Sequence, residues 1–237
     1  FKTGYGMTEA GPNTFWLHKE KVQSKPGSVG YPLMHVEIKL VDDQGNKITQ
    51  PDVHGELWIR GPHRTPGYLN NPQATADTID KQGWLHTGDL ASFDSDGCYY
   101  VVGRKKDMYI SGGENVYPIE VESLLFTHPA IAEAAVFGVP HHVWGEVGRA
   151  VVSLKANAEP QTEQAMIAWM RERIAHYKVP LKIYFTDVLP KTAAGKISKT
   201  QLREQYGELE PQDDRRSGKR QAWSDEERRG RHASDET

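Results

Sequence analysis

GRKKDMYISGGENVYPIE, residues 103–120, indicates how this chain is organised. It opens with three consecutive cations, passes through an acid into an apolar patch, and breaks at Gly112 and Gly113. Two adjacent glycines remove the Cβ barrier to positive φ, so a backbone or a ligand can approach this loop closely. The residues that follow are typical of a helix start: a proline at the first helical position, where a missing N–H costs least, and acids at the positive end of the helix dipole. We therefore expect a joint, then an exposed loop, then the start of a helix.

Strand patterns dominate the chain before this joint. Apolar and polar side chains alternate over 36–40, and turn residues close the run. Further strands are predicted over 56–60, 86–93 and 98–102, with a short helix over 73–79. Because consecutive strands prevail, residues 23–103 are expected to form a small sheet or barrel.

Helices and strands alternate after the joint. Apolar side chains at four-residue spacing predict a helix that follows residue 162, reaches about residue 176 and stops before Pro180. The other predicted elements are helices over 119–126 and 199–206 and strands over 133–139, 149–156 and 181–185. This pattern is typical of a compact α+β domain of about 100 residues.

Composition narrows the classes of protein to consider. The 237 residues carry a formal net charge of −3, which gives no reason to expect nucleic acid or an anionic membrane as the main partner. The single cysteine, Cys98, excludes an internal disulfide and fits a reducing, cytoplasmic compartment. No apolar run reaches the roughly 18 to 20 residues that span a bilayer. The histidines show no spacing typical of zinc ligands, and the pair at 141–142 is expected in a surface turn.

The last 31 residues, 207–237, combine mixed charge with hardly any apolar side chains. Such a segment cannot bury enough surface to offset its ordering entropy, so a disordered tail is expected. Trp223 is the one residue there that a binding motif could use.

Four motifs occur in one order: GYGMTEAGP at 4–12, GWLHTGD at 83–89, the quoted segment, and LPKTAAGKI at 189–197. Together they resemble the adenylate-forming superfamily, which includes acyl-CoA synthetases, luciferases and peptide-synthetase adenylation domains. The resemblance covers residues 1 to about 206. It implies that 1–104 is the end of a large N-terminal AMP-binding domain with a small β-barrel-like subdomain. A mobile C-terminal α+β domain with a small sheet and helices would follow over 105–206.

The first motif sets an aromatic ring, a hydroxyl and a carboxylate among glycines, as ATP-dependent activation of an acid requires. Mg²⁺ prefers hard oxygen ligands such as a carboxylate. By resemblance, Tyr5 stacks on adenine beside Gly6, Thr8 touches the phosphates and Glu9 holds the metal. For Thr8 alone, the alternative of a turn with a helix-capping threonine would be the better explanation.

Two further motifs supply charges for the nucleotide. A carboxylate after a glycine can accept two hydrogen bonds from a diol, and the resemblance implies that Asp89 binds both ribose hydroxyls with Arg104 beside it. Trp84 and His86 in the same motif are expected to serve packing. Lys196 lies in a polar loop, and a lysine is a compact charge suited to a transient anion. In the family this lysine lies over the carboxylate and the α-phosphate during adenylation, whereas Lys191 and Lys199 suit solvated surface positions.

Lys106 matches the family's hinge position, about which the C-terminal domain rotates between two poses. If the hinge is offset by one residue, Lys105 or Asp107 takes this place. The resemblance also implies that the pantetheine of CoA enters along Gly112 and Gly113. The alternative for these glycines is a tight turn with no ligand.

The resemblance implies an acid–thiol ligase of fatty acid or aryl acid metabolism that uses ATP, Mg²⁺ and coenzyme A. Its product would be an acyl-CoA. The chain begins at Phe1, almost on a site motif, without the upstream phosphate loop and acyl pocket, so we expect it to be part of a longer protein and inactive alone. One alternative is an adenylation domain that loads a carrier protein; the composition of the tail after Tyr206 counts against it, because this alternative predicts a folded domain with a phosphopantetheine serine there. A non-catalytic nucleotide-binding fragment and a luciferase-like oxygenase are the others. The acid itself stays open.

Overall fold

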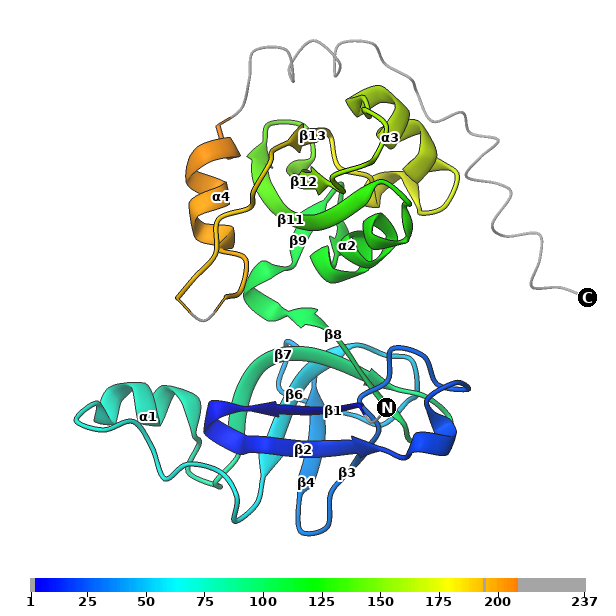
Figure 1. The fold of residues 1–237 in the computed structure, drawn as a ribbon. Helices are drawn as coiled ribbons and strands as arrows, with labels where there is room; N and C mark the ends of the chain where they lie inside the picture. Colours follow the sequence, from blue (N-terminus) through cyan, green and yellow to red (C-terminus); the bar gives the residue numbers. More distant parts are fainter. Residues whose placement is uncertain (1–2, 194, 209–237) are drawn as a thin grey trace, which may run out of the picture. The chain divides into compact units, whose positions relative to one another are not determined.

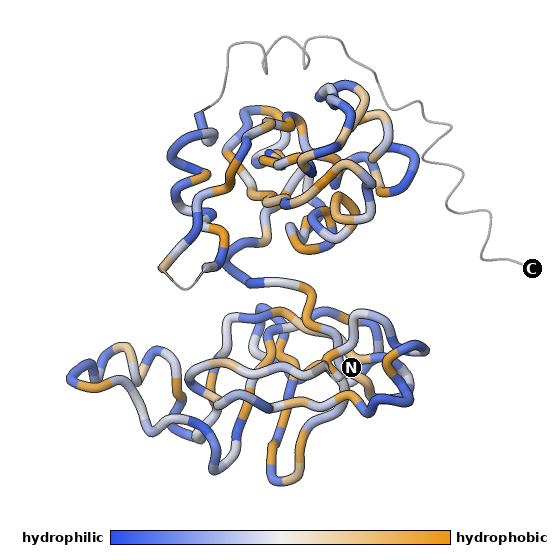
Figure 2. Tube along the Cα trace, viewed as in Figure 1, coloured by the Kyte–Doolittle hydropathy of each residue, from blue (hydrophilic) through white to orange (hydrophobic). Residues whose placement is uncertain are grey.

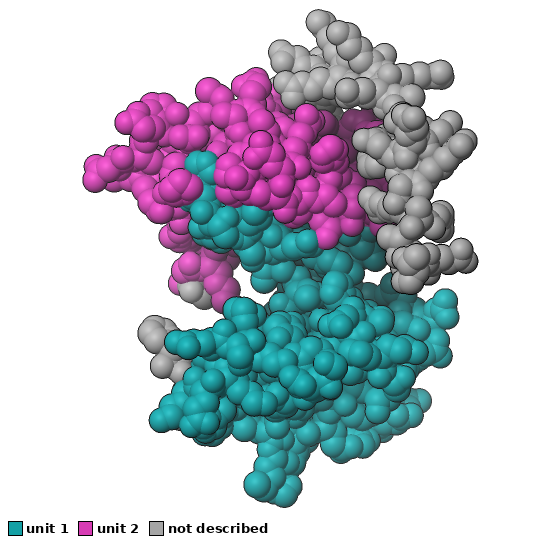
Figure 3. All heavy atoms as spheres, turned by 90° about the vertical axis from the view of Figure 1, so that its right-hand side faces the viewer, with its two compact units in different colours: residues 1–109, 115–128 teal, residues 110–114, 129–237 magenta. Residues whose placement is uncertain are grey.

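The computed structural model describes residues 3–193 and 195–208. The chain divides into two compact units (Figure 3): unit 1 holds residues 1–109 and 115–128, and unit 2 holds residues 110–114 and 129–237. The expected domain boundaries at residues 104 and 206 stay predictions. Nearly all of the predicted tail, including Trp223, lies outside the described residues.

Unit 1 contains two antiparallel sheets. The first sheet has the order β1-β2-β3, with strands β1 (Thr3–Met7), β2 (Gly11–Leu17) and β3 (Tyr31–Pro32). The second has the order β5-β4-β6-β7-β8, with β4 (Glu37–Val41), β5 (Lys47–Ile48), β6 (Gly55–Arg60), β7 (Leu85–Phe93) and β8 (Tyr99–Arg104). The hairpin β1/β2 crosses the strands of the second sheet (Figure 1). A shared core joins the two sheets, since Phe15 packs with Leu40, Leu57 and Leu85.

The short helices of unit 1 begin where the sequence predicts. Helix α1 (Pro72–Thr78) has Asn71 as its N-cap, whose side chain accepts a hydrogen bond from the Ala74 N–H. Helix α2 (Pro118–Thr127) has proline in its first turn and buries Val121 and Leu125. Three 3₁₀ turns complete this part of the chain: η1 (Thr8–Ala10), η2 (Lys19–Lys21) and η3 (Lys105–Asp107).

The glycine-rich first motif forms the hairpin β1/β2, which its composition did not predict. The chain folds back so tightly after η1 that a Cβ on Gly6 would lie 2.4 Å from the carbonyl oxygen of Gly11. A side chain at this position would collide with backbone that cannot move aside. Gly6 is therefore required by the hairpin itself, whatever else it contacts.

Of the two expected alternatives, a small sheet or a barrel, the structure shows open sheets. Closing a sheet into a barrel requires its two edge strands to pair at a consistent stagger. Here the edges are β5 and β8, and within the described residues β5 pairs only with β4. Because β5 is two residues long, it offers too short a ladder for closure.

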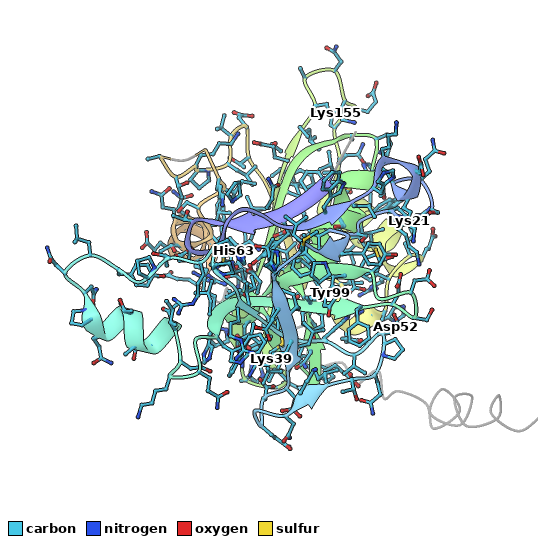
Figure 4. The ribbon with its side chains drawn as sticks, turned by 90° about the horizontal axis from the view of Figure 1, so that it is seen from below. Lys21, Lys39, Asp52, His63, Tyr99 and Lys155 are labelled. Carbon is cyan, nitrogen blue, oxygen red and sulfur yellow. The ribbon has the colours of Figure 1, made fainter. Side chains whose placement is uncertain are left out.

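One face of the second sheet carries a stack of rings and cations. The Nζ of Lys39 (labelled in Figure 4) lies 4.3 Å from the ring centre of Trp58 and 4.4 Å from that of Trp84. His86 stacks on Trp58 with ring centres 3.6 Å apart. The expected packing role of Trp84 and His86 is confirmed, and cation–π attraction helps to hold this face.

Unit 2 is built on one long antiparallel hairpin. Strands β11 and β12 pair along their whole length, and β13 runs parallel to β12. The sheet that contains this hairpin has the order β10-β9-β12-β11 with β13 off this path, and residues 109 and 115–116 of its first two strands are counted in unit 1. Its strands are β9 (Tyr109–Ser111), β10 (Glu114–Val116), β11 (Ile131–His141), β12 (Gly145–Leu154) and β13 (Lys182–Phe185). Its remaining elements are α3 (Glu163–Arg171), η4 (His176–Lys178) and α4 (Lys199–Tyr206).

Helix α3 ends at Arg171, about five residues before the predicted end. The N–H groups of Arg173 and Ile174 both bond to the carbonyl of Met170, so the last turn tightens before η4. Ile174 is half-buried but lies beyond the helix, so the apolar spacing continues past the point where helical backbone ends. The ends of the other predicted elements of unit 2 lie within four residues of their predicted positions.

The core of unit 2 lies under α4. Helix α4 is mostly hydrophilic (Figure 2), and its buried residue is Leu202, which packs with Phe137 and Leu189. Arg149 is 1% exposed and donates from Nη1 to the carbonyl of Tyr206 over 2.6 Å and to the Tyr184 hydroxyl over 2.5 Å. A buried cation that is bonded in this way fixes the end of α4 to β12 and β13. The mixed α+β class is confirmed.

Candidate functional site

Three side chains of unit 1 meet at the carboxylate of Asp89. Asp89 and Arg104 are direct neighbours across β7 and β8, a register that brings Cβ atoms to about 5 Å. The Arg104 Nε lies 2.6 Å from Asp89 Oδ1. From β1, the Tyr5 hydroxyl donates a hydrogen bond to Asp89 Oδ2. The structure therefore brings together three residues that the motifs predicted separately.

The surroundings of this cluster keep the Tyr5 hydroxyl protonated. The Asp89 side chain is 7% exposed, whereas Arg104 is 46% exposed and borders solvent. Burial, and then the hydrogen bond to Asp89, raise the pKa of Tyr5 far above its usual range. Tyr5 thus remains a neutral donor at any working pH. Its ring meets Phe15 edge-on at 5.9 Å, and its expected stacking on adenine stays a prediction.

An irregularity in β7 presents Asp89 to its partners. The pairing of β6 with β7 shifts register opposite Leu57, between Glu56 and Trp58. Within it, the Thr87 hydroxyl donates to the Leu57 carbonyl over 2.7 Å and accepts from the Asp89 N–H over 3.0 Å. Gly88 takes φ +68°, which favours glycine. Bulges of this kind commonly re-aim side chains beside functional sites.

Thr8 and Glu9 lie in η1, at the turn of the hairpin that carries Tyr5. Thr8 is exposed and Glu9 is half-buried. Glu9 Oε1 accepts a hydrogen bond from the Tyr68 hydroxyl over 2.8 Å. Sequence reasoning did not find Tyr68, because its position 59 residues away in a turn carries no signal of the contact.

The predicted hinge lies in η3, directly after β8. The Nζ of Lys105 lies 3.0 Å from Asp43 and 3.4 Å from Glu56, so this residue is tied to the second sheet of unit 1. The other Glu56 oxygen accepts from the Gly88 N–H over 3.3 Å. Lys106 is exposed, and the described part of the chain offers its side chain no partner. Of the two, Lys106 has the greater freedom.

The glycine pair of the quoted segment forms the turn between β9 and β10. Gly112 has φ +62° and Gly113 has φ +90°. The Gly112 N–H donates to the Trp144 carbonyl over 2.9 Å, and a Cβ on Gly112 would lie 3.1 Å from Trp144 Cε3. Trp144 is 46% exposed, so an aromatic face borders this loop. The sequence analysis did not identify Trp144. The available signal was its place in a turn directly before Gly145.

Of the neighbouring histidine pair, His142 lies in an exposed turn as expected, whereas His141 does not. His141 ends β11 and is buried, at 5% exposed. Its Nδ1 accepts from the N–H groups of Val143 and Trp144 over 3.2 and 3.3 Å. The ring therefore caps the turn that positions Trp144, a role that a run of two histidines does not reveal.

Lys196 lies in a tight turn of unit 2 that leads into α4. The Thr192 N–H donates to the Lys196 carbonyl over 2.7 Å, and the Gly195 N–H donates to the Thr192 carbonyl over 2.8 Å. At the base of the turn, Lys191 forms an ion pair with Glu133 over 2.6 Å. The Lys196 side chain is exposed, with no partner among the described residues. The turn thus presents one unpaired cation to solvent.

Two models of known protein families match the sequence of this chain. AMP-binding enzyme, as a family, matches residues 1–69, and AMP-binding enzyme C-terminal domain matches residues 120–196. The chain belongs to the AMP-binding, adenylate-forming enzymes. This places the Tyr5–Asp89–Arg104 cluster and the Lys196 turn in a family that binds AMP.

Relatives of this adenylate-forming chain include feruloyl-CoA synthase from an Amycolatopsis species, 44% identical over 207 residues, which are 87% of this chain and 42% of that protein. The 2-succinylbenzoate–CoA ligase of Geobacillus kaustophilus is 46% identical over 199 residues, 84% of this chain and 40% of the ligase. The o-succinylbenzoate CoA synthetase of Bacillus subtilis, solved with the acyl-adenylate intermediate OSB-AMP, superposes with a TM-score of 0.80 at 40% identity, over 88% of this chain and 42% of that chain. The chain thus spans about two fifths of the length of these relatives.

No helix within residues 3–193 and 195–208 combines the length and the apolar character that crossing a membrane requires.

Proposed function

We propose that this chain is the C-terminal part of an ATP-dependent carboxylic acid:CoA ligase. In the first half-reaction the substrate carboxylate attacks the α-phosphorus of ATP, the bond to the bridging oxygen breaks, and acyl-AMP and pyrophosphate result. In the second, the CoA thiol attacks the acyl carbon and gives up its proton, and AMP leaves. The products are acyl-CoA and AMP.

The observation that carries this proposal is the buried Asp89 carboxylate, which Tyr5 and Arg104 hold at the irregular end of β7. The oxygens of an ionised carboxylate are hydrogen-bond acceptors of the kind that the two hydroxyls of a ribose need. Arg104 borders solvent beside it and supplies a cation for the same nucleotide. Relatives that share this part of the chain are named as CoA ligases, which supports the same chemistry here.

Glu9 suits a magnesium ion that is shared with substrate phosphates. No group of three or more His, Cys, Asp or Glu side chains in the described ranges could hold a metal ion, so this part of the chain provides no all-protein cage. Mg²⁺ is commonly bound through one or two carboxylates together with phosphate oxygens. Glu9 offers one such carboxylate, and Thr8 beside it offers a hydroxyl for the phosphates. When bound, the cation would neutralise phosphate charge; o-succinylbenzoate CoA synthetase has been solved with ATP and a magnesium ion.

Lys196 would serve the first half-reaction and the Gly112–Gly113 loop the second. An unpaired lysine in a turn can approach the carboxylate and the α-phosphate, where negative charge develops. The glycine loop, bordered by Trp144, offers exposed backbone to the pantetheine of CoA. Rotation at Lys106 would bring first the Lys196 turn and then the Gly112–Gly113 loop to the substrate.

The proposed partners are a small-molecule carboxylic acid and CoA, nucleic acid is not among them, and the expected compartment is the cytoplasm.

The test is acid-dependent exchange of labelled pyrophosphate into ATP by the full-length protein. A panel of ferulate, 2-succinylbenzoate and a long-chain fatty acid covers the aryl and fatty classes. We expect one class to support exchange and, when CoA is added, to give the corresponding thioester by mass spectrometry. Exchange without any thioester, but with acylation of a carrier protein, would contradict a CoA ligase. Nucleotide binding without exchange for any acid would indicate a non-catalytic protein.

A further inference from the structure

The carboxylate of Glu9 already has a partner within unit 1. The Tyr68 hydroxyl donates to Glu9 Oε1 over 2.8 Å. The second oxygen of Glu9 has no partner in the described part of the chain. One oxygen is therefore fixed and the other is available.

The loop between β6 and α1 holds Tyr68 in place independently of this contact. The Tyr68 N–H donates to the Thr75 hydroxyl over 2.9 Å, and its carbonyl accepts from the Asn71 N–H over 3.2 Å. Gly67 before it has φ +154°, and a Cβ there would lie 2.6 Å from Thr75 Cγ2. The tyrosine is thus presented by a loop that packs closely on the start of α1.

The same loop is joined to η1 through its backbone. The Thr65 N–H donates to the Glu9 carbonyl over 2.7 Å. Arg64 in turn donates from Nη1 to the Thr65 carbonyl over 2.8 Å and from Nε to the Gly83 carbonyl over 3.1 Å. His63, labelled in Figure 4, belongs to this loop as well. Backbone and side chain of Glu9 are therefore held by one segment of the chain.

A hydrogen-bonded carboxylate is the usual form of a metal ligand. Ligating carboxylates generally accept a further hydrogen bond from an outer residue, which fixes their orientation and their basicity. The loop that carries Tyr68 is held by three hydrogen bonds of its backbone, one to Glu9 in η1 and two to Asn71 and Thr75 at the start of α1.

We propose that Tyr68 is a positioning residue that holds Glu9 Oε1 and so directs Glu9 Oε2 toward the Mg²⁺ of the nucleotide. This inference rests on the proposed function, because it assumes that Glu9 takes part in binding the metal. Tyr68 acts through Glu9 and does not touch the cation. Its contribution should appear in metal affinity rather than in the rate at saturating metal.

The test compares Tyr68→Phe with Tyr100→Phe in the full-length protein. Tyr100 donates to the Asp94 carboxylate over 3.2 Å, so the control removes the same kind of bond elsewhere in unit 1. Mn²⁺ serves as the probe, and its binding in the presence of a non-hydrolysable ATP analogue is measured by electron paramagnetic resonance. Losing an outer partner of a metal ligand typically costs about 10- to 100-fold in metal affinity. We expect Mn²⁺ affinity to fall by this factor in Tyr68→Phe and to stay unchanged in Tyr100→Phe. High Mg²⁺ should restore the rate of pyrophosphate exchange in Tyr68→Phe.

A third variant, Glu9→Gln, separates the two hypotheses. If Glu9→Gln weakens Mn²⁺ binding and Tyr68→Phe does not, the role given to Tyr68 is wrong while the proposed function stands. If Glu9→Gln leaves Mn²⁺ binding unchanged, both the assignment of Glu9 and the inference about Tyr68 fail. A thermal unfolding curve of each variant shows that it is folded at the temperature of the measurement. An equal weakening in Tyr68→Phe and Tyr100→Phe would also overturn the inference.

Discussion

At the scale of single residues, Asp89 is the group on which nucleotide binding should depend most. Asp89→Asn removes the charge that faces Arg104 and one acceptor for a ribose hydroxyl. A hydrogen bond to a charged group contributes about 1.5 to 3 kcal/mol, which is roughly 10- to 100-fold in affinity. We expect the KM for ATP to rise by this factor in pyrophosphate exchange. The control is Asp52→Asn, an exposed position labelled in Figure 4 with φ +61°, which asparagine tolerates. Equal values of KM for the two variants would contradict the assignment.

A second carboxylate, Asp94, should govern part of the acid sensitivity of unit 1. Burial alone would raise its pKa, but hydrogen bonds from Lys25, the Cys98 N–H and Tyr100 outweigh burial and lower the pKa to about 2. In an unfolded chain the value is about 3.9. The stability that Asp94 contributes is therefore fully present above about pH 4 and is lost as the pH falls toward 2.

Asp94→Asn should consequently flatten the acid side of the stability curve. We expect the free energy of unfolding to be lower than in the wild type at pH 7 and to fall less between pH 4 and pH 2. Urea denaturation followed by tryptophan fluorescence measures both. Two curves that run parallel through this window would show that Asp94 does not gain its stabilising interactions on folding.

The residues of the site could be predicted from the sequence one at a time, but the contacts between them could not. Motif spacing identified Tyr5, Asp89 and Arg104, yet the register that joins β7 to β8 and the irregularity opposite Leu57 depend on tertiary pairing. Tyr68 could not be found, because a contact across 59 residues leaves no local pattern.

At the scale of elements, the joint at η3 is the place where backbone freedom should matter. Lys105 is tied to Asp43 and Glu56, so rotation would begin after it, at Lys106. Proline fixes φ near −65° and removes a backbone N–H. In the full-length enzyme Lys106→Pro should retain more of acyl-AMP formation than of thioester formation, as measured in separate half-reaction assays. Lys106→Ala, which leaves φ free, should lose less thioester formation than Lys106→Pro. Equal loss of both half-reactions in the proline variant would place the pivot elsewhere.

Most helices and strands were predictable, because their periodicity and caps are local properties. Strand β6 and helices α2 and α4 lie within about one residue of their predicted ends. The hairpin β1/β2 was not predicted, because its glycines conceal a strand pattern and Gly6 is explained only by the close backbone of Gly11. The open edge at β5 was also beyond reach, since strand pairing decides whether a sheet closes.

At the scale of the whole molecule, the proposal gives the two half-reactions to different loops of unit 2: the Lys196 turn to acyl-AMP formation and the Gly112–Gly113 loop to thioester formation. The Tyr5–Asp89–Arg104 cluster, proposed to bind the nucleotide, lies in unit 1. Their cooperation in one enzyme is a property of the proposed full-length ligase. A group that acts in only one half-reaction therefore gives the clearest test.

Lys196→Ala is that test, with the two half-reactions measured separately by rapid quench in the full-length protein. Negative charge grows where the carboxylate attacks the α-phosphate, and a preorganised cation there lowers the barrier more than it stabilises bound ATP. Losing such a group typically costs about 10²- to 10³-fold in rate, or roughly 3 to 4 kcal/mol. The control is Lys155→Ala, an exposed lysine of unit 2 that bonds to the Pro129 carbonyl. We expect acyl-AMP formation to slow by about this factor in Lys196→Ala alone, while supplied acyl-AMP still reacts with CoA at nearly the wild-type rate. Equal slowing of both steps in Lys196→Ala would contradict the account.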